Sequence, residues 1–426
     1  MDPNRAAQSL ILAEVRSLET RLDGVMPFSL HMTMVGAASA SRRAHLAIQR
    51  HMDREIQRLR RGIASFLEAL DTGLAPADAQ RRLSFLKLRF NVVLSHFDIY
   101  SDVLVQRSEH VHGVQLAGLD ALAGDALNIP GYGDEIPPVL CYLDRGQGAA
   151  IRRARTRLPG GGDNPVALIR VPRERMIGSG IGSSLVHEVG HQVAALLDLV
   201  SPLRRRLVAK AHGNALSPWA ALERWISEIV ADFWSILKLG VTSTLGLIGV
   251  VSLPNAFVFR IGLDDPHPFP WLRVQLSCAI GGALYPDREW PLLAAAWEQL
   301  YPLSSQSDEN QQFIADLLDT VPAFVELLLG FRPPALAGRA LVDLVDPELT
   351  PTSLRALGSA FRSRAAELRP VTAVATIGQA RFEGRLSATR EAGLLRGLLV
   401  DWALRRFNGP LASETRLRTA IEGRGA

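Results

Sequence analysis

The stretch that most constrains this chain covers residues 183–197 and reads SSLVHEVGHQVAALL. Its apolar residues recur at three- and four-residue spacing, and no proline interrupts it before Pro202, so the pattern predicts a single helix. We expect Ser183 or Ser184 to cap the start of this helix by accepting a hydrogen bond from a backbone N–H.

Two histidines on this predicted helix indicate a metal site. His187 and His191 are four residues apart, so their imidazoles project from one face and can share one zinc ion. Glu188 lies about 100° round the helix, where its carboxylate can reach a metal-bound water without binding the metal. This is the HExxH arrangement, in which the glutamate serves as general base.

A surface helix with two solvated histidines is the alternative interpretation. It fits poorly, because the histidines are surrounded by apolar side chains that predict a largely buried helix. A buried group of two histidines and a glutamate requires a reason, and metal binding supplies one. The apolar residues concerned are Leu185, Val186, Val189, Val193, Leu196 and Leu197.

A second carboxylate-bearing helix is predicted over residues 218–234, PWAALERWISEIVADFW. Glu228 and Asp232 are four residues apart on one face among apolar neighbours, which suggests a metal ligand and a hydrogen-bond acceptor that supports a ligand. Glu223 is a competing ligand. It lies about 140° from Glu228 around the helix, and its position beside Arg224 favours a place at the surface.

The two segments HEVGH (187–191) and EIVAD (228–232) together resemble the metal site of the gluzincin zinc metallopeptidases, of which thermolysin is the familiar member. The resemblance implies a zinc ion held by His187, His191 and Glu228. It also implies that Glu188 acts as the base and that Asp232 orients His187 through its second ring nitrogen. The metzincin pattern does not fit, because Ala194 and Leu197 occupy positions that metzincins fill with glycine and histidine.

A proline-rich segment over residues 264–274, DDPHPFPWLRV, carries two further candidates. Its three prolines predict a rigid, extended path that aims His267, and Arg273 stands near the start of a helix. Many zinc peptidases of this broad type have a His-Pro followed by an arginine near the active site. The resemblance implies that His267 steadies an oxyanion and that Arg273 holds a substrate carbonyl or the carboxylates of the metal site. The alternative is a rigid surface turn.

Composition bears on the compartment and on partners. The only cysteines among 426 residues are Cys141 and Cys278, so neither a disulfide framework nor a cysteine-based zinc cluster is expected. The N-terminal segment, which begins MDPN, has no basic run followed by an apolar core, so it does not match a signal peptide. We therefore expect a cytoplasmic protein. The net charge is +4 and the basic residues are almost all arginine. The short basic runs at 152–153 and 204–206 are more typical of solvated faces than of binding patches, so nucleic acid is not an expected partner.

The uncharged run at residues 239–259 is long enough to span a membrane. It also contains three glycines, several hydroxyl side chains, Pro254 and Asn255, and it follows the segment that carries the metal site. We therefore expect a buried core helix here, and a membrane is not an expected partner.

The predicted fold class is mainly α with a small β-sheet (α+β), a zincin-like catalytic core flanked by helical regions. The predicted divisions are a helical bundle or hairpin at 1–112, a catalytic domain at 113–300 and a helical region at 301–426. Strands are expected at 139–143 and 166–171, and the free edge of the second could pair with an extended peptide. Histidines 31, 45, 51, 96, 110 and 112 are expected to be structural or to lie at the surface.

The function that follows is that of a zinc metallopeptidase, a hydrolase that cleaves peptide bonds in a peptide or protein substrate with Glu188 activating the water. The alternative is a zinc-containing scaffold or assembly protein with a latent or inactive peptidase-like site, whose helical regions contact a protein partner. Glu188 distinguishes the two, because a purely structural zinc site does not need it and usually fills all four coordination positions with protein ligands.

Overall fold

The structure, a computed structural model, describes residues 2–25, 35–132, 136–145, 148–172, 178–262, 264–359 and 367–422, with His110 and 409–422 as backbone alone. The described chain is mainly α-helical and contains a small three-stranded sheet, so the predicted fold class is confirmed at that level. His31 lies outside the described residues.

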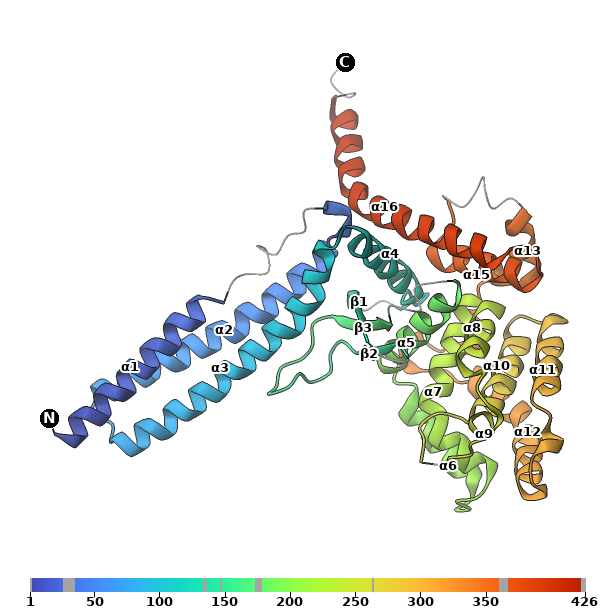
Figure 1. Cartoon of the computed structure of the whole chain (residues 1–426), viewed down its shortest axis with the longest axis horizontal. Helices are drawn as coiled ribbons and strands as arrows, with labels where there is room; N and C mark the ends of the chain where they lie inside the picture. Colours follow the sequence, from blue (N-terminus) through green and yellow to red (C-terminus); the bar gives the residue numbers. More distant parts are fainter. Residues whose placement is uncertain are drawn as a thin grey trace.

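Three long helices form an elongated arm that projects from the rest of the molecule (Figure 1): α1 (Pro3–Asp23), α2 (Arg42–Asp71) and α3 (Pro76–Val105). The start of α2 is capped by Ser41, whose hydroxyl accepts from the backbone N–H of Ala44, and Pro76 occupies the first turn of α3. Apolar residues at helical spacing face inward along all three helices and give the arm its own core.

A small sheet lies at the base of the arm. It consists of β1 (Val139–Asp144), β2 (Ala150–Arg152) and β3 (Ala167–Pro172) in the order β1-β3-β2. β1 runs parallel to β3 and β2 runs antiparallel to it. Because β3 is the central strand, the expected free edge at 166–171 was wrong. The edge strand closest in sequence to the HExxH helix is instead the short β2.

Alternate residues of the sheet face two different cores. Leu140 and Leu168 pack into the arm core, whereas Cys141 and Ile169 pack into the core of the body. This is the alternation expected of strands that are covered on both faces.

Side chains of the 3₁₀ turn that directly follows α3 hold the arm to the sheet. The amide of Gln106 donates to the carbonyl of Leu143 (2.9 Å) and accepts from its N–H (2.7 Å). Arg107 forms a buried two-bond ion pair with Asp120, which also accepts from the N–H of Cys141 at 2.7 Å. The base of the arm and β1 are therefore held together by partly buried hydrogen bonds of Gln106 and by the fully buried contacts of Arg107 and Asp120.

The body is built from helices that share one continuous buried core, which extends from Leu116 to Trp402 and so includes buried side chains on both sides of residue 301. Its helices are α4 (His110–Ala126), α5 (Gly180–Leu196), α6 (Val200–Ala211), α7 (Pro218–Leu239), α8 (Val241–Val251), α9 (Asn255–Val258), α10 (Pro270–Leu284), α11 (Glu289–Leu300), α12 (Asp308–Leu329), α13 (Pro351–Ser359), α15 (Pro370–Phe382) and α16 (Ala388–Glu422). Short 3₁₀ helices occur at Gly36–Ala38, Gln106–Ser108, Leu303–Ser305, Pro334–Leu336, Leu341–Leu344 and Pro347–Leu349.

The uncharged run at 239–259 is divided among three helices. Gly240, with φ of 55°, ends α7, and Pro254 precedes the short α9. Between them α8 buries its first turns, where Thr242 donates to the carbonyl of Ala375. Among the described helices, none combines the length and apolar character needed to cross a bilayer.

Candidate metal centre

A close contact between α5 and α7 builds the centre, and Gly190 makes that contact possible. A Cβ at Gly190 would lie 2.7 Å from the carbonyl oxygen of Ala231 and 2.8 Å from its Cα. No side chain fits into that space, so glycine at this position lets the two helices approach closely. The glycine between the two histidines of HEVGH thus has a packing role.

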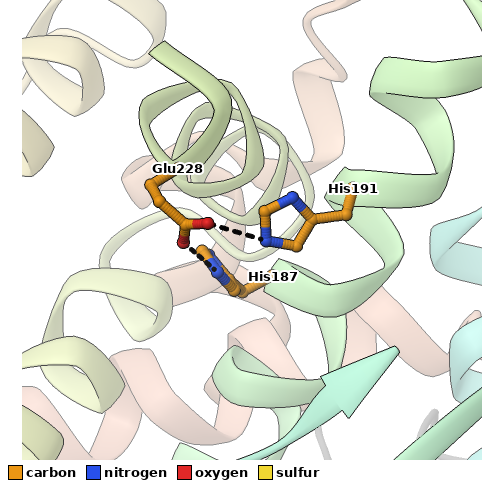
Figure 2. Close-up of side chains that lie close together, drawn as sticks. All are labelled: His187, His191 and Glu228. Carbon is orange, nitrogen blue, oxygen red and sulfur yellow. Dashed lines mark ion pairs between the residues drawn. The ribbon is translucent and has the colours of Figure 1, made fainter. Parts of the chain in front are cut away.

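The approach of the helices brings three ligand-type side chains together (Figure 2). The Nε2 atom of His187 lies 3.2 Å from Oε2 of Glu228, and Nε2 of His191 lies 3.4 Å from Oε1. One ligand atom from each residue falls within 4.8 Å of the others. The two rings point at the carboxylate from α5 while Glu228 reaches down from α7. These three residues could hold a metal ion.

The surroundings of Glu228 fit those of a metal ligand. Its Oε2 atom is buried and has no hydrogen-bond partner in the described part of the chain. His187 and His267 each place an Nε2 atom 3.2 Å away, but neither contact has the alignment of a hydrogen bond. Burial raises the pKa of Glu228, yet the imidazoles of His187, His191 and His267 outweigh it and hold the pKa well below its usual range. A metal ion would give the buried oxygen the partner it lacks.

Asp232 sets the orientation of His187. Its Oδ1 atom lies 2.8 Å from Nδ1 of His187, so that nitrogen carries the proton and Nε2 is directed to the candidate metal position. Burial disfavours a charged imidazole, but Asp232 outweighs it and raises the pKa of His187 to about 9. A metal ion must therefore displace a proton from His187 at neutral pH.

Arg273 holds Asp232 in turn. Its Nε atom donates to Oδ2 of Asp232 at 2.7 Å and its Nη2 atom donates to Oδ1 at 2.9 Å. Burial raises the pKa of Asp232, and the guanidinium and His187 together more than offset this and lower it. Arg273 thus stands behind the centre and contacts it through a carboxylate.

Glu188 lies beside the three ligands without joining them. It is buried, and burial raises its pKa above the usual value. With His187, His267 and Arg273 it lines a cavity of about 150 Å³. The structure therefore places all seven sequence-predicted site residues around one centre, with Glu188 positioned to exchange a proton with a molecule in the cavity.

His267 stands at the rim of this cavity. Its Nδ1 atom lies 2.8 Å from Oδ1 of Asp265, which also accepts from the backbone N–H of His267 at 2.9 Å. The Glu228 carboxylate raises the pKa of His267. Asp265 was not among the predicted site residues, although an aspartate two positions before a histidine in a proline-rich turn is a recognisable signal.

The competing ligand Glu223 does not belong to the centre. Its Oε1 atom accepts from Nε of Arg204 on α6 at 2.7 Å, and its side chain is 22% exposed. This ion pair joins α6 to α7.

The expected serine cap of the HExxH helix was wrong. α5 begins at Gly180, and the hydroxyl of Ser183 donates to the carbonyl of Ser243 at 2.9 Å. The start of the helix is instead supported by Glu391 of α16, whose Oε1 accepts from the backbone N–H of Ser179 at 2.8 Å. A carboxylate can reach this position only through the tertiary fold.

Serines that the sequence did not single out form the floor of the cavity. The hydroxyl of Ser243 donates to that of Ser235 at 2.8 Å, and Ser277 bonds to Thr244 at 2.7 Å. The hydroxyls are scattered over three helices, so nothing in their sequence spacing indicates that they meet.

No family model matches this chain, and no curated protein or solved structure matches it either. What can be said of its chemistry therefore comes from its own residues and their arrangement.

Proposed function

We propose that this protein is a zinc-dependent metallopeptidase whose zinc ion is held by His187, His191 and Glu228. The observation that carries the proposal is the buried Glu228 oxygen, which faces imidazole nitrogens and has no hydrogen bond from any described residue. Two imidazoles and one carboxylate are zinc ligands, and three protein ligands leave a position open, as in catalytic rather than structural sites.

A bound zinc ion would lower the pKa of a water molecule and polarise a substrate carbonyl. Glu188 then accepts a proton at its carboxylate from the attacking water and delivers it to the leaving amine. Its raised pKa supports this role, because a group that both takes and gives a proton works best with a pKa near the operating pH.

His267 and Arg273 have different supporting roles in this proposal. His267 stands at the open rim with a raised pKa, so as a cation it can donate to an oxygen that gains charge during the reaction. Arg273 uses Nε and Nη2 on Asp232, which favours the role of fixing the metal-site carboxylates over that of binding a substrate carbonyl.

The edge of the sheet supports a peptide as the substrate. Gly148 and Ala149, which lead into β2, line the same cavity as His187 and Glu188. Among the described strands β2 pairs with β3 alone, so its other edge can form main-chain hydrogen bonds with an extended peptide.

The substitution Glu188→Gln tests the proposal. The amide is nearly isosteric and is not a ligand, so metal content and thermal midpoint should stay close to those of the wild type. Cleavage of a peptide library should fall by a factor of about 10² to 10⁴, because the carboxylate that moves the proton is lost.

Chelation followed by zinc add-back is the control for this experiment. Cleavage that survives Glu188→Gln would remove Glu188 from the reaction. A wild-type protein that binds zinc and cleaves no peptide would favour the alternative, a zinc-containing scaffold with an inactive site.

A further inference from the structure

A second cavity adjoins the metal cavity. It has a volume of about 640 Å³, and Ser184, Gly246 and Val250 line both. The two cavities together follow α5 and α8 towards the junction of α15 and α16, which lie above α8 in Figure 1. The second cavity is several times larger than the first, which has room for little more than one side chain.

Two glycines of α8 shape the wall of this groove in different ways. A Cβ at Gly246 would lie 2.3 Å from Cβ of Ser183, so this glycine is needed for α8 to pack on α5. A Cβ at Gly249 would meet nothing within 4 Å. Packing does not require glycine at position 249, yet its missing side chain keeps the groove open.

The far end of the groove carries an ion pair between Arg381 and Glu391. Nε of Arg381 lies 3.5 Å from Oε2 of Glu391, and the arginine side chain is 46% exposed. Oε1 of Glu391 is already engaged by the N–H and hydroxyl of Ser179, at 2.8 and 2.5 Å. The two terminal nitrogens of Arg381 form no hydrogen bond with described residues, so they remain available to an anion.

The lining between these points mixes apolar side chains with polar atoms of serines and of the main chain. Ile181, Leu245, Val250 and Phe382 line it together with backbone of the glycines. A groove with apolar side chains and main-chain polar groups along its length, and with the outer nitrogens of an arginine at one end, suits an extended chain whose uncharged residues are followed by a carboxylate.

We infer that this groove binds the substrate of the peptidase proposed above, and that it selects an extended polypeptide with a carboxylate placed to meet Arg381. The inference rests on the proposed function for the position of the bond that is cleaved. The carboxylate belongs to an acidic side chain or to the C-terminus of the substrate, because both present the same two oxygens to a guanidinium.

Binding to a protein that cannot turn over substrate tests the groove apart from catalysis. The probes are fluorescein-labelled decapeptide pools with Glu or Gln at one fixed position, each made with a free or an amidated C-terminus. Fluorescence anisotropy with zinc-loaded Glu188→Gln protein should show about fivefold tighter binding of a carboxylate-bearing pool than of its amide counterpart. The position of the preferred carboxylate distinguishes a side chain from a chain end.

Substitutions at two positions, made in the Glu188→Gln background, locate the effect. Arg381→Gln should abolish the preference for a carboxylate, and Arg381→Lys should restore part of it. Gly249→Phe should weaken the binding of all peptide pools at least tenfold, because the ring fills the groove. The matched control Gly249→Ala should bind the pools like the parent protein. Thermal midpoints report whether each variant is folded.

The outcomes separate the groove from the catalytic proposal. The proposed role of the groove is overturned if the carboxylate preference persists in Arg381→Gln, or if the Gly249→Phe and Gly249→Ala proteins bind equally well. Either result holds even if the wild type cleaves peptides. Binding that requires Arg381 and an open position 249 supports the groove even if the wild type cleaves nothing, in which case the peptidase proposal fails. No binding of any pool overturns the groove.

Discussion

At the scale of single residues, the centre depends on a chain of contacts rather than on three ligands alone. Glu228 faces the imidazoles, Asp232 holds His187 at 2.8 Å, and Arg273 holds Asp232 through two hydrogen bonds. Each contact fixes the orientation of the next side chain inward, which lowers the entropy that metal binding would otherwise have to overcome.

A graded series of variants should therefore show graded metal loss. Glu228→Ala should abolish zinc binding, and Asp232→Asn should weaken it by about ten- to a hundredfold, because the amide supports the wrong tautomer of His187. Glu223→Ala is the matched control, since Glu223 pairs with Arg204, and it should bind zinc like the wild type. Competition titration with a chromogenic chelator measures all three. Full affinity in Glu228→Ala would mean that the third ligand is misassigned.

At the scale of elements, the spacing between α5 and α7 decides whether the ligands meet. That spacing is set at Gly190, where the backbone of Ala231 occupies the space of a side chain. The contact that brings His187, His191 and Glu228 close together therefore involves none of these three side chains.

Gly190→Ala should separate the two helices and so weaken the centre. We expect a destabilisation of about 1–3 kcal/mol from overpacking, together with a loss of zinc affinity. Gly249→Ala is the control, because its added methyl group meets no protein atom and helical alanine is favoured over glycine. Denaturant unfolding and metal titration of both variants test this. A Gly190→Ala protein as stable as the Gly249→Ala protein would contradict it.

Much of the centre could be predicted because helical spacing is local. The four-residue separations of His187 and His191, and of Glu228 and Asp232, require only that each segment is a helix. The serine cap and the sheet order could not be predicted in this way. Ser183 finds its partner on α8, and β2 is a three-residue strand whose place at the edge depends on pairing with β3. Such contacts depend on tertiary structure, and local propensity does not encode them.

At the scale of the whole molecule, the arm contains a buried pair of histidines. Nε2 of His96 lies 2.9 Å from the carbonyl of Pro159, so it donates, and Nδ1 of His96 accepts from Nε2 of His51 at 3.2 Å. In this arrangement His96 uses one ring nitrogen as a donor and the other as an acceptor. Burial, followed by repulsion from His96, lowers the pKa of His51 to about 4.

The arm should therefore lose stability in mild acid. As pH falls from 6.5, the ordinary pKa of histidine, towards 4, the unfolded chain binds a proton at His51 that the folded chain excludes. The loss from this group is at most about 3 kcal/mol. His51→Gln keeps a donor for His96 and cannot titrate, so its thermal midpoint should fall less between pH 7 and 5 than that of the wild type. His112→Gln, at an exposed histidine, is the control and should follow the wild type.

The attachment of the arm also has a mechanical consequence. The helices α2 and α3 have 30 residues each and are about 45 Å long, so any rotation of the arm about Gln106 and Arg107 would be largest at its tip. A rotation of about 10° would move the tip by about 8 Å. Conversely, a force on the tip would be transmitted to β1. The sheet that receives it includes the strand β2, whose approach forms part of the wall of the metal cavity.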